Sequence, residues 1–206
     1  MPSRRLVSRA AREYEARDWG LIPLGTRDKK PLIQPPELQS QRSTKSEVSA
    51  WYRRWPCANV GILTGMISDL VVLDIDPRHG GDASLFELEQ SHGPLPRTLE
   101  AHTGGGGHHI YLRHPGGSVP DGISLAPGLE IRGDGGFVVA PPSMHPSGRR
   151  YVWDAARHPD DTPICDMPDW LVSEIQKRDG QNESSVTHFR ILASDIFESS
   201  GRAAAL

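Results

Sequence analysis

The strongest chemical signal in the sequence is a pair of aspartates at the end of an apolar segment. Residues 70–73 read Leu-Val-Val-Leu, and Asp74 and Asp76 follow with one residue between them. Four apolar residues predict a buried strand, and alternate strand residues share a face, so the carboxylates should lie about 6–7 Å apart at the backbone. A divalent cation removes the repulsion between them, and ion pairs held by carboxylates serve phosphoryl transfer. A solvated Asp-Pro turn explains the motif equally well.

The second signal is a run of four glycines before two histidines, His108 and His109. Successive glycines such as Gly106 and Gly107 let backbone amides approach an anion closely, as phosphate-binding loops do. His109 faces one side of the strand predicted next and His108 faces the other. A histidine beside such a loop can donate to a phosphate oxygen or transfer a proton. A flexible glycine loop with a surface histidine is the plain alternative.

Glu130 and Arg132 form the third signal, because both lie on one face of a strand predicted over residues 129–132. Such a pair is most often an ion pair across a sheet. In a metal site, Glu130 would be a third ligand and Arg132 would hold a triphosphate through two hydrogen bonds. Asp134 is a competing acid, but it sits in a glycine turn where an aspartate is expected for structural reasons.

The fourth signal is a polar loop stiffened by two prolines. Pro141 and Pro142 hold Ser143 and His145 in place after a predicted strand. These short polar side chains can bind phosphate or sugar oxygens, although Pro-Pro-Ser alone predicts only a loop. The four signals gain weight from their order along the chain, because isolated motifs rarely occur in this succession by chance.

Helices and strands alternate along the chain and must position these residues. Apolar spacing after Ser3 predicts a helix that ends near Gly20, and a capping box from Thr44 to Glu47 begins a second helix. Asp82 is expected to cap a third helix. The other predicted elements are strands at 21–24, 59–64, 70–75, 98–102, 109–113 and 151–153, a hairpin of 129–132 with 137–140 turning at 133–136, and a helix at 168–177.

Composition limits the class of protein. The chain has 206 residues, of which 36% are hydrophobic and 24% charged, which excludes a disordered acidic chain. No apolar run approaches the roughly 18 residues of a membrane span, and no signal segment follows Met1. A net charge of −3 excludes a globally basic nucleic-acid coat but leaves room for a local basic groove. Two distant cysteines fit neither a disulfide framework nor a cysteine-rich zinc site, so we expect a cytoplasmic protein.

The interleaved elements predict an α+β or α/β fold with a mixed sheet. We assign residues 1–178 to one domain, which carries all four signals. Residues 179–185 read as a linker, and the tail to residue 202 includes a possible helix at 186–197. We interpret residues 203–206, Ala-Ala-Ala-Leu, as derived from a cloning vector, in which case the natural protein continues further.

Together these motifs resemble the primase–polymerase (prim-pol) domain of the archaeo-eukaryotic primase superfamily, of the type in replication proteins of phages, plasmids and prophages. The first acidic motif of the family matches Asp74 and Asp76, and its third motif matches Glu130. Its Thr-x-x-Gly-Gly-x-His strand matches residues 103–109, which selects His109 over His108. The resemblance covers residues 10–154, with further matches at 19–24, 30–31, 59–65, 135–143 and 148–153.

This resemblance implies an α+β fold with an RRM-like mixed sheet joined to a second small α/β unit, and an active site in the cleft between them. It implies that Asp74, Asp76 and Glu130 bind two divalent ions, Mg²⁺ or Mn²⁺, and that His109 contacts the phosphates of the incoming nucleotide. Arg132, Ser143 and His145 are further expected nucleotide contacts. Some relatives carry a zinc-binding stem. The two cysteines of this chain are isolated, which argues against such a stem here.

The activity that the resemblance implies is template-directed nucleotidyl transfer in replication. The expected partners are single-stranded DNA template and primer, dNTP or NTP, and a helicase region carboxyl-terminal to the domain, with the host cytoplasm as the location if a phage encodes the protein. One alternative is a replication-initiator nickase with an RRM-like core, which uses paired histidines and a tyrosine nucleophile. The other is a catalytically inactive module that binds nucleic acid or nucleotide.

Overall fold

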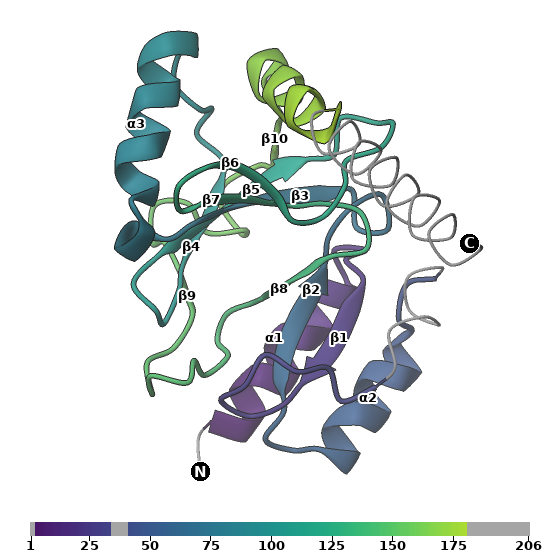
Figure 1. The fold of residues 1–206 in the computed structure, drawn as a ribbon. Helices are drawn as coiled ribbons and strands as arrows, with labels where there is room; N and C mark the ends of the chain where they lie inside the picture. The colour runs from purple at the N-terminus through teal and green to yellow at the C-terminus, as the bar shows by residue number, and fades with distance from the viewer. Residues whose placement is uncertain (1–2, 34–40, 181–206) are drawn as a thin grey trace, which may run out of the picture.

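The computed structural model describes residues 3–33 and 41–180, which form two β-sheets with helices around them (Figure 1). The smaller sheet contains three strands in the order β1-β2-β8. These strands are Leu21–Leu24 (β1), Asn59–Leu63 (β2) and Phe137–Val139 (β8). Strand β2 pairs with β1 on one side and β8 on the other, so it is the central strand, and both pairs are antiparallel.

The larger sheet has the strand order β6-β7-β3-β5-β4-β9, with β10 added beside β5. All its pairs are antiparallel except the pair of β10 with β5, so the sheet is mixed, as predicted. Its strands are Leu70–Ile75 (β3), Leu99–His102 (β4), His108–Arg113 (β5), Ile123–Ala126 (β6), Leu129–Arg132 (β7), Val152–Trp153 (β9) and Cys165–Asp166 (β10). The fold is therefore α+β.

Strand β3 contributes to two hydrophobic cores because its side chains alternate between the faces of the larger sheet. Leu70 and Val72 point into a core shared with the smaller sheet and helix α1 (Ser3–Glu15). Val71 and Leu73 point into a second core that includes Leu171 from the helical residues 169–180. Burial on both faces explains why this strand is almost entirely apolar.

Helix α2 (Lys45–Arg54) begins with the predicted capping box, in which Thr44 and Glu47 bond each other's backbone N–H groups. Helix α3 (Gly81–His92) corrects the prediction that Asp82 is its cap. Gly80 occupies that position in a left-handed conformation, and Asp82 lies in the first helical turn. A short 3₁₀ helix, η2 (Pro77–His79), leads into this glycine and needs its positive φ to turn the chain.

The predicted hairpin of residues 129–132 with 137–140 is wrong. Strand β7 pairs with β3 and β6 in the larger sheet, whereas β8 pairs with β2 in the smaller one. The glycine-rich segment between them is a crossover between sheets. Asp134 holds it there by accepting hydrogen bonds from the backbone N–H groups of Met66 and Val119, partners that a local turn pattern does not reveal.

The remaining strand predictions are confirmed to within two residues, while β6, β10 and η2 were not predicted. The predicted helix at 168–177 is present and continues through residue 180, so residues 179 and 180 do not begin a linker. The rest of the predicted linker, the predicted helix at 186–197 and residues 203–206, which we interpreted as vector-derived, lie outside the described residues. Within the described ranges, no helix has the length and apolar character needed to cross a lipid bilayer.

A buried tyrosine, Tyr14, connects α1 to the segment after β8 and to β9. The Tyr14 hydroxyl donates to the Pro141 carbonyl at 2.7 Å and accepts from the Trp153 indole N–H at 2.8 Å. We predict that Tyr14→Phe lowers the free energy of unfolding by about 1–3 kcal/mol, because the buried Pro141 carbonyl and the half-buried Trp153 indole lose their partner. Urea unfolding measures this loss.

Tyr52→Phe is the matched control, because the Tyr52 hydroxyl makes only a 3.4 Å contact with the Asn59 carbonyl. Its expected cost is less than about 1 kcal/mol. Equal losses in the two variants would contradict a special contribution from the Tyr14 bonds.

Candidate active site

The register of three neighbouring strands brings the predicted residues together. In the larger sheet, Asp74 of β3 lies directly opposite His109 of β5 on one side and Glu130 of β7 on the other. Residues opposite each other in antiparallel strands share a face and have Cβ atoms about 4.5–5.5 Å apart. The three polar side chains therefore form one row across the sheet, on the face that also carries Leu70 and Val72.

Asp76 lies beyond the end of β3, where its side chain caps η2. Its carboxylate accepts hydrogen bonds from the backbone and side-chain N–H groups of Arg78, at 2.8–3.0 Å, and lies 2.9 Å from His79 Nδ1. The bond from Arg78 holds the pKa of Asp76 well below its usual range, with His79 adding to the effect. Asp76 is thus ionised and partly neutralised by the residues that follow it.

Arg132 lies among the carboxylates of the row. Its Nη2 is 2.9 Å from Glu130 and 4.0 Å from Asp74, and its Nη1 is 3.7 Å from Asp121. Side chains on β7 alternate, so Arg132 shares the face of Glu130, as predicted. The guanidinium therefore balances negative charge that would otherwise repel within the row.

His109 is the most buried member of the row, with 5% of its surface exposed. Its Nε2 lies 3.6 Å from Asp74, whereas its Nδ1 has no hydrogen-bond partner among the described residues. Burial lowers the pKa of His109 to about 4, although the nearby Asp74 carboxylate opposes this shift. The ring is consequently neutral at pH 7 and retains one N–H to donate.

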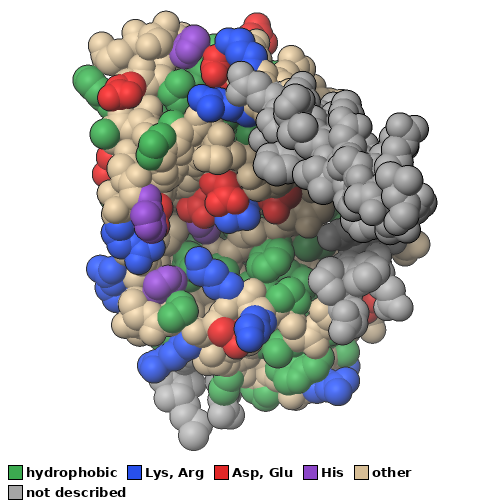
Figure 2. All heavy atoms as spheres, viewed as in Figure 1, with side chains coloured by type: hydrophobic (Ala, Val, Ile, Leu, Met, Phe, Trp, Pro, Cys, Tyr) green, Lys and Arg blue, Asp and Glu red, His purple; other side chains and the backbone are tan. Residues whose placement is uncertain are grey.

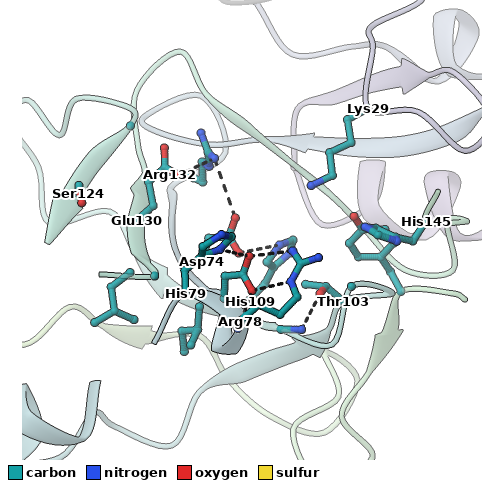
Figure 3. Close-up of a pocket in the computed structure, with 18 residues that line it drawn as sticks. Lys29, Asp74, Arg78, His79, Thr103, His109, Ser124, Glu130, Arg132 and His145 are labelled. Carbon is teal, nitrogen blue, oxygen red and sulfur yellow. Dashed lines mark hydrogen bonds and ion pairs between the residues drawn. The ribbon is translucent and has the colours of Figure 1, made fainter. Parts of the chain in front are cut away.

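These side chains line a cavity of about 570 Å³. Figure 3 shows Asp74, His109, Glu130 and Arg132 on one side of it and Lys29 and His145 across from them. In the space-filling view, acidic side chains lie at the middle of this face with basic side chains and histidines around them (Figure 2). A smaller cavity of about 190 Å³ shares Asp74, His109 and Arg132 and extends toward β8. The space suits an anionic ligand held beside a cluster of carboxylates.

Several lining residues were not predicted as site residues. Lys29 comes from the loop after β1, and Tyr151 comes from the segment before β9. Arg78 and His79 lie two and three residues after Asp76, and their basic character beside an acidic pair was a readable signal. Lys29 and Tyr151 had no such signal, because the packing of the smaller sheet against the larger one brings Lys29 here and the pairing of β9 with β4 brings Tyr151.

The glycine loop packs closely but does not present free amides from its last two glycines. Gly106 donates to the Thr103 carbonyl at 3.0 Å, and Gly107 donates to the Thr103 hydroxyl at 2.9 Å. A Cβ on Gly107 would lie 2.2 Å from the Ile75 carbonyl oxygen, so this position requires glycine for close approach. Gly105 and Gly107 line the cavity, and Gly106 does not.

Of the two polar residues predicted in the proline-rich loop, one reaches the cavity. His145 lines it, and burial lowers the pKa of its ring. Ser143 is fully buried away from it, with its hydroxyl accepting from the Val60 N–H at 3.0 Å and donating to the Val60 carbonyl at 3.2 Å. The serine hydroxyl thus joins its loop to the smaller sheet.

The donor chemistry of the three predicted acids fits hard divalent cations. Asp74, Asp76 and Glu130 supply carboxylate oxygens, the ligands that Mg²⁺ prefers, and all three line one water-accessible cavity. In this structure an arginine lies beside each of these acids. Arg78 pairs with Asp76, and Arg132 lies beside Asp74 and Glu130. Cations bound here would take over charge compensation that the arginines provide.

We predict that Ser143→Ala lowers the free energy of unfolding by about 1–3 kcal/mol, because the buried Val60 N–H loses its acceptor. Ser124→Ala is the control, since Ser124 is exposed at the cavity rim and its change should stay within about 0.5 kcal/mol. Chemical denaturation of both variants measures the difference. An unchanged stability for Ser143→Ala would show that its hydroxyl has no structural role.

Comparison with known proteins gives one family. The family described as Bifunctional DNA primase/polymerase, N-terminal, matches residues 11–170. A search of curated proteins finds no match to the chain. The family match contains the whole row of Asp74, His109 and Glu130, as well as Asp76, Arg132 and His145. Because it covers well over half of the sequence, the chain belongs to the Prim-Pol family of bifunctional DNA primase/polymerase N-terminal domains.

Proposed function

We propose that this domain catalyses template-directed nucleotidyl transfer, synthesising or extending primers on single-stranded DNA. Family membership implies a nucleotidyltransferase of the DNA primase/polymerase type. The main support for template-directed transfer is the strand register, which sets Asp74 between His109 and Glu130 in the lining of one cavity. Carboxylates beside a cavity edged by cationic side chains are what a nucleoside triphosphate and its metal ions require.

In this proposal Asp74, Asp76 and Glu130 hold two divalent ions, Mg²⁺ or Mn²⁺. Such ions activate the attacking 3′-hydroxyl and neutralise charge on the triphosphate and leaving pyrophosphate. The protein contributes a rigid platform, because Asp74 is anchored in the central strand of the larger sheet with paired strands on both sides. Positioning of the reacting groups in this way accounts for much of the catalysis of phosphoryl transfer.

The two arginines have a second task in the proposed reaction. Arg78 and Arg132 pair with the acids in the present structure and line the cavity. With cations bound to the acids, the guanidinium groups would be free to contact the phosphates of the nucleotide, which they could hold with paired hydrogen bonds. Lys29 and His145, on the opposite side of the cavity, are further candidates for phosphate or sugar contact.

His109 is proposed to donate a hydrogen bond to a phosphate oxygen of the incoming nucleotide. Its ring is neutral at pH 7 and lines the cavity, with Nε2 3.6 Å from the Asp74 carboxylate. A buried neutral donor stabilises developing negative charge without titrating at physiological pH. The proposal assigns no contact to the amides of Gly106 and Gly107, which already bond Thr103, or to the Ser143 hydroxyl.

The expected partners are a single-stranded template, a primer and dNTP or NTP, with a helicase region in the full protein. The nickase alternative has less support, because it needs neighbouring histidines on one ion. His108 and His109 lie on opposite faces of β5, with His109 in the acidic cavity and His108 in a different one. A binding-only module remains distinguishable by assay, since it would bind nucleotide and DNA without incorporating nucleotide.

We predict that Asp74→Asn and Glu130→Gln each reduce nucleotide incorporation by at least about 100-fold, because each substitution removes a charged metal ligand while keeping side-chain size. Primer extension on a single-stranded template, with Mg²⁺ or Mn²⁺ and each nucleotide type in turn, measures the loss. Reactions without primer separate de novo synthesis from extension.

Asp69→Asn is the matched control for these variants. Asp69 is an exposed aspartate just before β3, where it pairs with Arg113 at 3.0 Å outside the cavity. The control should keep full activity, and circular dichroism should show that all three variants fold. Wild-type incorporation by Asp74→Asn would refute the metal assignment.

We further predict that His109→Gln lowers kcat/KM for the nucleotide by about 100-fold, since it replaces a positioned donor in a buried site. Steady-state incorporation at varied nucleotide concentration gives this value. His158→Gln, which changes a half-buried histidine outside the cavity, should leave it unchanged. If both variants retain the wild-type value, His109 does not contact the nucleotide.

A further inference from the structure

A second cluster of ligand-type side chains lies on the other face of the larger sheet. Glu100, His102 and His108 each offer one potential metal-binding atom, and these three atoms lie within 4.8 Å of one another. No other set of three such residues within 3–33 and 41–180 converges so closely. Glu100 and His102 alternate with Leu99 and Ala101, which face the core shared with the smaller sheet. The cluster is therefore behind the candidate active site.

The cluster is fixed by the pairing of β4 with β5. His102 is the last residue of β4, His108 is the first residue of β5, and the two are direct partners across the ladder. Their rings lie 4.9 Å apart in an edge-on arrangement. Glu100 precedes His102 by two residues on the same face, and its carboxylate lies 2.8 Å from His108 Nδ1. Three donors thus converge through backbone register rather than through flexible loops.

Two further charged groups complete the surroundings. The carboxylate of Asp154, just after β9, lies 3.0 Å from His102 Nε2, and Arg157 pairs with the second oxygen of Glu100. Glu100 and His108 also line a cavity of about 690 Å³ that is bounded by residues of α3. The side chains of His102 and His108 are 40% and 32% exposed, so a solvated ion can reach them.

We propose that Glu100, His102 and His108 form a binding site for Zn²⁺. Two imidazoles and one carboxylate are a donor set that suits this ion, with zinc–ligand distances of about 2.0–2.2 Å. Tetrahedral coordination separates donor atoms by about 3.3 Å, so small side-chain rotations from the present arrangement suffice. Asp154 orients His102 through its ring nitrogen, as carboxylates commonly do for metal-bound histidines.

The position of the site gives the ion a structural role. His102 and His108 flank residues 103–107, so an ion bound to both closes the base of the glycine loop. That loop lines the candidate active-site cavity, and His109 directly follows one of the ligands. Zinc would therefore tie β4 to β5 behind the residues that contact the nucleotide. The proposal requires no catalytic step and stands independently of the proposed polymerase activity.

Calorimetric titration of ZnCl₂ into metal-free protein tests the proposal. We expect one ion per chain at this site, with affinity reduced at least about 100-fold in both His102→Gln and His108→Gln, because each loses a direct ligand. Zinc should raise the melting temperature of the wild-type protein and leave that of the variants unchanged. Excess Mg²⁺, which prefers oxygen ligands, should not displace it.

Two controls separate this site from other sources of binding. His92→Gln removes a histidine that also faces a carboxylate, Glu174 at 3.9 Å, but that belongs to no three-ligand cluster in the described residues. Asp74→Asn removes a carboxylate from the candidate active site. With excess Mg²⁺ present to occupy the active-site carboxylates, both should keep the wild-type affinity for zinc at the Glu100, His102 and His108 cluster. Wild-type affinity in the two ligand variants, or no stoichiometric binding at all, would overturn the proposal and leave the cluster as an ion-pair network among Glu100, His108 and Arg157.

Discussion

The central constraint in this structure is the position of β3 between β5 and β7. The strand must be apolar to be buried on both faces, yet it carries Asp74 near its end, opposite His109 and Glu130. Antiparallel register turns three residues that are far apart in the sequence into neighbours on one face. A shift of one residue in either ladder would move a whole row of side chains to the wrong face, so core packing and site geometry enforce each other.

Charge compensation is the second organising feature. Carboxylates at the end of a buried strand would repel one another, and arginines from nearby positions offset that cost. Arg78 holds Asp76 from two residues away, whereas Arg132 reaches Glu130 from the same strand and Asp74 from the next. These ion pairs are partly exposed and weak, so a bound ligand can replace either partner of a pair. The same arrangement that stabilises the free protein leaves both the acids and the guanidinium groups accessible to ligands.

The strand pair β4–β5 presents different chemistry on its two faces. His109 and Tyr111 face the cavity side, whereas His108 joins Glu100 and His102 on the other. The glycine loop connects the strands and lies beside the acidic cavity, since Gly107 packs on the Ile75 carbonyl and lines that cavity. Any interaction that restrains one face of this pair also restrains the other, because the two faces share one backbone.

Local sequence patterns were sufficient for the buried strand, the capping box at Thr44, the shared face of Glu130 and Arg132, and the opposite orientation of His108 and His109, whereas the family resemblance selected His109. These features depend on side-chain alternation and on neighbours within a few residues. Tertiary structure alone decided the separation of β7 from β8 into different sheets, the turning of Ser143 toward Val60, and the arrival of Lys29 at the cavity. Each of these depends on contacts between segments distant in the chain, because loop composition does not specify where a chain crosses from one sheet to another.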